Sequence, residues 1–213
     1  MKTMAALLLA TLLGSPPALA SQDVLEAERA RISEDMDKLV QRQVWPGAER
    51  KFVELAALGV PLSVEEYVAG ATAARELGDV EQARARLREA ARIKGSREIV
   101  AWLTDIDNNY GHVVLVSVPA RTAELAVGAP PFDPNQRKAV DAAIRLAKQD
   151  GEFRGLLPKG DYTFAGQKFS VEPGLSVRIE VSPRMRRQGI TDPVILYREM
   201  PGAITTPPSA PDR

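Results

Sequence analysis

The chain of 213 residues contains no cysteine and a single histidine, His112. The absence of cysteine excludes disulfides and cysteine-linked lipids, so packing alone must stabilise the fold. One histidine supplies too few ligands for a zinc centre, and no nearby residues complete a triad with it. We therefore predict no catalytic residue, no metal site and no cofactor.

Other absences exclude further classes of function. Lys and Arg number 28, as do Asp and Glu, so no net charge attracts nucleic acid or an anionic membrane. The sequence has no phosphate-binding glycine loop. The apolar run of residues 5–13 is far shorter than the roughly 20 residues that cross a bilayer. We expect a protein that neither binds nucleic acid nor spans a membrane.

The first twenty residues have the pattern of an export signal. Lys2 precedes the apolar run, a Gly-Ser-Pro-Pro segment interrupts it, and Ala18-Leu19-Ala20 forms a small-x-small cleavage site. We predict that residues 1–20 are a signal peptide cut after Ala20. The mature protein is then periplasmic or secreted.

Residues 21–109 are predicted to be helical. Apolar residues recur at helical spacing over residues 23–43, and the pattern restarts four times before residue 109. Ser63 and Glu66 form a capping box at one helix start, and Ser96 caps the last helix. The helices therefore come as pairs joined by short turns.

The helix pairs repeat at a period of about 35 residues. Ile32, Tyr67 and Trp102 stand at equivalent positions. Such a period is typical of a tetratricopeptide array, and the segment 67–93 resembles one tetratricopeptide repeat. The resemblance covers about two repeats over residues 29–109, with a last helix as the cap. A generic bundle of α-helical hairpins is the alternative interpretation.

The resemblance implies a concave groove lined by the first helix of each pair. Its positions in this sequence are Ser33, Asp37, Gln41, Glu65, Val68, Thr72 and Arg75. These residues are the candidate partner-binding site. The alternative is that they form ordinary solvated helix faces.

Residues 110–201 are predicted to form short strands with one inserted helix. Val113–Val118 is a β-branched run, residues 176–182 alternate apolar and polar, and 194–197 are a candidate edge strand. Asp133-Pro134 starts a helix that ends at Gly151 and covers one face of the sheet. The predicted fold is α+β, with a small antiparallel β-sandwich after the helices.

The segment 151–181 resembles the PEGA and carboxypeptidase-regulatory-like β-sandwich modules. The resemblance rests on a hairpin with Leu157, Pro158, Gly160 and Tyr162, and on a second turn at Pro173-Gly174. Such modules are mostly non-catalytic and occur in envelope proteins. Residues 202–213, rich in Pro, Thr and Ser, are predicted to be a disordered tail.

These patterns favour a non-enzymatic adaptor of the bacterial envelope. Its groove and β-sandwich would bind envelope proteins. The alternative is a module that binds envelope polysaccharide or peptidoglycan. Arginine clusters at 84–92 and 184–187 are solvated faces or contacts to such an anionic polymer. A cleft lined by two carboxylates with shifted pKa values would instead favour an enzyme.

Overall fold

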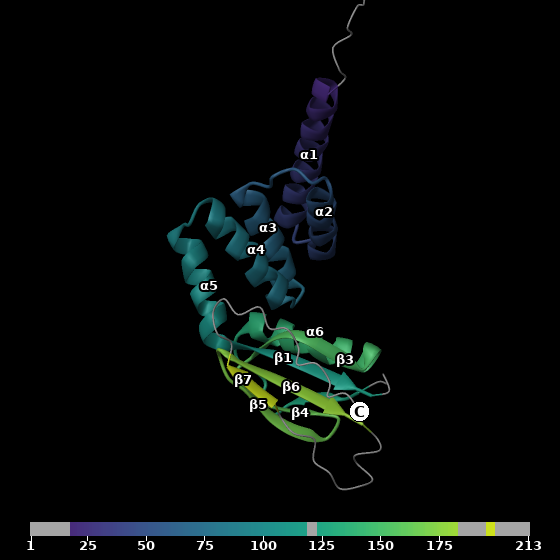
Figure 1. The fold of residues 1–213 in the computed structure, drawn as a ribbon, viewed down its shortest axis with the longest axis vertical. Helices are drawn as coiled ribbons and strands as arrows, with labels where there is room; N and C mark the ends of the chain where they lie inside the picture. Colours follow the sequence, from purple (N-terminus) through teal and green to yellow (C-terminus); the bar gives the residue numbers. More distant parts are fainter. Residues whose placement is uncertain (1–17, 119–122, 183–194, 199–213) are drawn as a thin grey trace, which may run out of the picture.

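The structure is a computed structural model that describes residues 18–118, 123–182 and 195–198. Five helices precede the first strand, and a sixth is inserted between the second and third strands, so the fold is α+β (Figure 1). The helices are α1 (Ala18–Gln41), α2 (Trp45–Ala57), α3 (Val64–Glu76), α4 (Val80–Ile93), α5 (Arg97–Asn109) and α6 (Pro134–Asp150). The strands are β1 (Tyr110–Ser117), β2 (Leu125–Val127), β3 (Glu152–Pro158), β4 (Gly160–Phe164), β5 (Gln167–Val171), β6 (Leu175–Val181) and β7 (Ile195–Arg198).

Several predictions fall wholly or mainly on parts of the chain that the structure leaves undescribed. Residues 1–17 of the predicted signal peptide, the arginines at 184–187 and the tail at 202–213 lie outside the described residues. Helix α1 begins at Ala18 and runs across the predicted cleavage site. The signal peptide and the disordered tail therefore stay predictions.

Side-chain caps set the helix starts where the sequence predicts them. Ser63 accepts a hydrogen bond from the backbone N–H of Glu66, whose carboxylate accepts one from the backbone N–H of Ser63, completing the capping box. The Ser96 side chain accepts a hydrogen bond from the backbone N–H of Ile99 and so caps α5. The Asp133 side chain accepts from the backbone N–H groups of Asn135 and Gln136 and so caps α6. Gly151 ends α6 with φ +73°, in the left-handed region that favours glycine.

The helices α1 to α4 pack against one another in chain order (Figure 1). Their interfaces are built from small or aliphatic residues that are fully buried. These residues include Met36, Ala48, Leu55, Ala71, Ala83, Leu87 and Ala90. Small side chains let two helix backbones approach closely, which is why alanine is abundant before residue 109.

One buried arginine joins three of these helices. The guanidinium of Arg86 on α4 binds both carboxylate oxygens of Glu49 on α2 at 2.6 Å and the carbonyl of Gly70 on α3 at 2.7 Å. Its Cζ also lies 4.0 Å from the ring centroid of Phe52. Gly70 has no side chain because a Cβ there would lie 2.2 Å from that ring.

The strands form two small sheets, and one departs from the antiparallel prediction. The first sheet has the order β3-β1-β6-β7 and the second the order β2-β4-β5. β1 and β6 run parallel, with Val113 opposite Val177, so the first sheet is mixed. This pairing is possible because a long connection, including α6, separates β1 from β6 in the chain. The predicted strand near 194–197 is confirmed as β7, which pairs with β6.

The predicted hairpin at residues 157–162 is wrong. β3 belongs to the first sheet and β4 to the second, so the chain crosses between sheets at Lys159. The N–H of Lys159 donates to the carbonyl of Asn109, and the Tyr162 hydroxyl donates to the Pro158 carbonyl. Leu157 and Pro158 are buried here, whereas a hairpin turn would leave them at the surface. Pro173-Gly174 does form a turn, but it too connects the two sheets.

A single apolar cluster joins both sheets to α6. Leu115 and Ile179 come from the first sheet, Phe164 from the second, and Ala143 from α6, and all four are fully buried. The inserted helix therefore covers the sheets, as predicted. No helix in the described part of the chain is long and apolar enough to cross a membrane.

Replacing Gly70 with alanine is expected to lower the free energy of unfolding by about 1–3 kcal/mol, the usual cost of overpacking. The better helix propensity of alanine offsets at most about 1 kcal/mol of this. Gly95→Ala is the control, because a Cβ there meets its nearest atom at 3.7 Å. Urea denaturation measures both variants, and equal stability of the two contradicts the tight packing at Phe52.

Replacing Arg86 with methionine is expected to cost about 3 kcal/mol of stability. This loss of stability is at the low end of the range for a broken buried ion pair, because the Glu49 side chain is 26% exposed and stays partly hydrated. Arg88→Met on the exposed face of the same helix is the control and should change stability by less than about 0.5 kcal/mol. Indistinguishable urea midpoints for the two variants contradict the role given to Arg86.

Candidate functional site

The first row of predicted site residues lies along α1. Ser33, Asp37 and Gln41 are spaced four apart, which places them on one side of the helix. Ser33 is half-buried and hydrogen-bonds Glu66 of α3, so α1 and α3 meet beside this row. Asp37 and Gln41 are exposed and form no hydrogen bond or ion pair with the residues that the structure describes.

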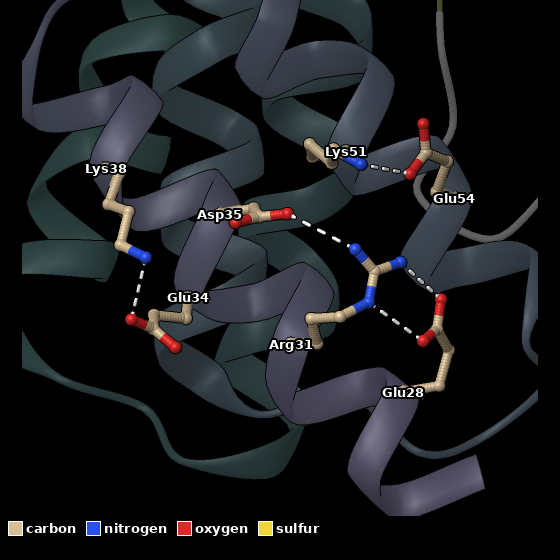
Figure 2. Close-up of polar contacts among 7 residues, drawn as sticks. All are labelled: Glu28, Arg31, Glu34, Asp35, Lys38, Lys51 and Glu54. Atoms are coloured by element: carbon tan, nitrogen blue, oxygen red, sulfur yellow. Dashed lines mark hydrogen bonds and ion pairs between the residues drawn. The ribbon is translucent and has the colours of Figure 1, made fainter. Parts of the chain in front are cut away.

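The neighbouring face of α1 is different, because its charges neutralise one another. Figure 2 shows Arg31 between Glu28 and Asp35, and Lys38 bound to Glu34 at 2.7 Å. On α2, Lys51 binds Glu54 at the same distance. Exposed pairs of this kind contribute little to stability, but they leave few unpaired charges for a partner. Asp37 and Gln41 lie at the edge of this face, three residues from Glu34 and Lys38 respectively, and remain unpaired among the described residues.

The second row lies on α3 and continues onto α5. Glu65 is exposed, and Thr72 is half-buried with its hydroxyl donating to the carbonyl of Val68. Val68 and Trp102 both pack against the core that α3 shares with α4 and α5. The guanidinium of Arg75 lies 4.9 Å from the centroid of the Trp102 ring. This cation–π contact places α5 next to α3 and fixes the Arg75 side chain.

Glu66 connects the two rows, although the sequence indicated only its capping role. Its carboxylate accepts hydrogen bonds from Arg29 of α1 at 2.7 Å and from the backbone N–H of Ser63 at 2.6 Å. Burial disfavours the charged form, but the bonds from Arg29, Ser63 and Ser33 outweigh it and lower the pKa of Glu66. The ionised carboxylate thereby holds α1 against α3.

The arginine cluster at 84–92 does not form one basic face. Arg86 is buried, Arg84 binds Asp107 at 2.6 Å, and Arg92 binds Glu89 at 2.8 Å. Asp107 lies on α5, so the Arg84 pair joins α4 to α5. Arg88 and Arg92 are exposed, as predicted for a solvated face, whereas the prediction is wrong for Arg86, because helical periodicity alone does not show which arginine faces a neighbouring helix.

The lone histidine stands between the helical and the strand regions. His112 Nε2 lies 3.7 Å from a carboxylate oxygen of Glu81, and this contact lowers the pKa of Glu81. Glu81 is on α4 and His112 on β1. The pair therefore contributes a polar contact between α4 and the first sheet.

Two clefts lie away from the rows on α1 and α3. One, of about 410 Å³, lies between α2, α4 and the loop at residues 58–63, with Phe52, Tyr67 and Arg86 among its walls. The other, of about 240 Å³, lies where the α3–α4 turn faces α6 and β3. We call this second cavity the junction cleft; it is lined by Glu49, Ala74, Leu77, Gly78, Asp79, Val80, Ala142, Arg145, Leu146, Phe153, Arg154 and Gly155.

Two carboxylates, Glu49 and Asp79, line the junction cleft. Burial raises the pKa of Asp79. However, one Asp79 oxygen caps α4 at Gln82, and both Glu49 oxygens bind Arg86. Acid–base catalysis needs a carboxylate that is free to exchange a proton with a substrate. This geometry favours structural roles for both side chains.

Comparison of the chain with protein-family models, with curated proteins and with solved structures gave no match.

The pH dependence of stability tests the Glu66 contact. The pKa of Glu66 in the folded protein lies below the ordinary value of 4.5. The contribution of its ionised carboxylate to the free energy of unfolding is therefore complete above pH 4.5 and is lost as the pH falls through the folded pKa. Glu66→Gln should cost about 1–3 kcal/mol at neutral pH, and the cost should shrink in acid. Glu65→Gln, at the exposed neighbour, is the control. A cost for Glu66→Gln that does not change with pH contradicts this assignment.

Proposed function

We propose that the protein is a non-enzymatic adaptor that binds envelope proteins on the face formed by α1, α3 and α5. We call this surface the first-helix face. The main supporting observation is that Asp37, Gln41 and Glu65 are exposed there without polar partners among the described residues, beside a face of α1 whose charges are paired. Unpaired polar groups can bind a partner without first breaking an internal contact.

The packing of the helices supports the tetratricopeptide-like interpretation. α1 and α3 meet through Glu66, and α3 and α5 meet through Arg75 and Trp102. α1 and α3 are thus neighbours, and α3 reaches α5 through this contact; first helices that lie side by side are a feature of an array with a continuous binding face. α5 has no following partner helix, since the chain passes directly into β1, and it would act as the cap.

The strand region is proposed as a second docking element, a β-sandwich similar to the PEGA and carboxypeptidase-regulatory-like modules. The apolar cluster shared by both sheets supports this interpretation. The alternative function, binding of an envelope polysaccharide or peptidoglycan, would use this region instead. The proposed location is the periplasm or the secreted space, and it rests on the signal-peptide pattern of residues 1–20.

Site-specific photo-cross-linking in cells tests the adaptor function. A photoreactive amino acid at Asp37 or Glu65 should give discrete cross-linked products with envelope proteins. The same amino acid at Arg31, on the ion-paired face of α1, or at Arg88, on the exposed face of α4, should give none. Adding Arg75→Glu and Thr72→Arg to the cross-linking chain should remove the products.

The pattern of products decides between the two functions. Equal cross-linking at all four positions contradicts a binding role for the first-helix face. Products that contain only cell-wall fragments favour the polymer-binding alternative. Urea denaturation of the Arg75→Glu, Thr72→Arg chain checks that loss of cross-linking does not reflect unfolding, since Arg75 also stacks on Trp102.

A further inference from the structure

The junction cleft brings opposite charges together without pairing them. Arg145 comes from α6 and Arg154 from β3, and both are exposed residues in its lining. Neither arginine forms a hydrogen bond or ion pair with any residue that the structure describes. Asp79, in the same lining, has no ion pair there either, and its one polar contact is the helix cap at Gln82.

Apart from Glu49, whose carboxylate is bound to Arg86, the rest of the lining is apolar. Leu77, Ala142 and Leu146 contribute aliphatic surface, and Phe153 contributes an aromatic ring. Leu146 keeps 39% exposure, which is high for a leucine and leaves apolar surface available at the cleft. Burial of a small apolar group against these side chains is therefore favourable.

The volume limits the size of a ligand. About 240 Å³ is below the 300–1,000 Å³ of typical pockets for drug-sized molecules. A ligand of this cleft is therefore about the size of one amino acid. Its charges must match two arginines and one carboxylate, and its remaining part must be apolar.

We propose that the junction cleft binds a small zwitterion with an apolar side chain, an apolar α-amino acid. Arg145 and Arg154 bind the carboxylate, because guanidinium groups match carboxylate geometry. Asp79 binds the ammonium group. The positive charge of this group offsets the desolvation that raises the pKa of Asp79. The side chain packs on Leu77, Leu146 and Phe153. This site is separate from the first-helix face and does not depend on the adaptor function.

The position of the cleft gives binding a structural consequence. Asp79 lies at the α3–α4 turn, whereas Arg145 and Arg154 lie on the α6 and β3 side. A ligand that contacts both sides stabilises the arrangement of the helices against the sheets, because it binds the folded protein and not the unfolded chain. Binding should therefore raise the midpoint of unfolding as well as produce a titration signal.

Titration of the full-length mature chain with three related compounds tests the charge assignment. L-Leucine carries both charges, N-acetyl-leucine lacks the ammonium group, and leucinamide lacks the carboxylate. Calorimetry up to about 20 mM should detect saturable binding of leucine at millimolar affinity or tighter. Leucinamide should bind at least about tenfold more weakly, as expected for the loss of one charge-assisted hydrogen bond.

Two sets of variants assign the contacts. The double variant Arg145→Gln, Arg154→Gln should weaken leucine binding about tenfold or more. Asp79→Asn should weaken binding of leucine but not of N-acetyl-leucine, and it keeps a side-chain oxygen that can cap α4. Arg88→Gln, outside the cleft, is the control and should bind leucine as the unmodified chain does.

Three outcomes would overturn the proposal. They are no saturable binding of leucine at about 20 mM, equal binding of all three compounds, and equal binding by the unmodified chain and the double arginine variant. Urea midpoints of every variant show whether a loss of binding reflects unfolding. If Asp79→Asn does not fold, the double arginine variant still tests the site, since both arginines are exposed and unpaired among the described residues.

Discussion

The arrangement of the helices depends on the buried guanidinium of Arg86. Its bonds to Glu49 and to the Gly70 carbonyl, with its stacking on Phe52, fix α4 against α2 and α3 at one point. A buried arginine is favourable only when its charge and its donors are satisfied, and Glu49 does most of this. The same geometry requires glycine at position 70, because the Phe52 ring beneath the arginine occupies the space that a side chain would need.

The strand region is positioned by two separate contacts with the helices. α5 passes into β1 without a linker, and Tyr110 at that point is buried in a cluster with Ile106. Further along, the Gly78 turn packs against α6, since a Cβ there would lie 2.4 Å from the Lys138 carbonyl, and Lys138 also pairs with Glu76. The junction cleft lies beside this second contact, lined by residues of the α3–α4 turn, α6 and β3.

Local features of the fold could be predicted from the sequence, because they depend on neighbouring residues. The caps at Ser63 and Ser96 and the helix after Asp133 follow from short-range hydrogen bonds. The parallel pairing of β1 with β6 and the crossing at Lys159 depend on which distant strands meet, and alternation carries no such information. The Leu157–Tyr162 segment suggested a hairpin because a Pro-x-Gly corner between sheets uses the same residues as a turn.

The same distinction applies to the candidate sites. The first-helix face could be proposed from residues three or four apart on single helices, whereas its contacts within the chain, such as that of Arg75 with Trp102, are seen only in the structure. The junction cleft had no sequence signal, because Asp79, Arg145 and Arg154 belong to three distant elements and none is unusual alone. Their shared position distinguishes them: Arg29, Arg31 and Arg86 bind carboxylates, whereas Arg145 and Arg154, like Arg88, have no ion pair among the described residues, and these two line the same cleft as Asp79. An exposed arginine is solvated by water, so leaving it without an ion pair costs little free energy. It can still form charge-assisted hydrogen bonds to the carboxylate of a ligand. Unpaired charges that line one cleft are therefore better indicators of binding than clusters whose charges bind one another.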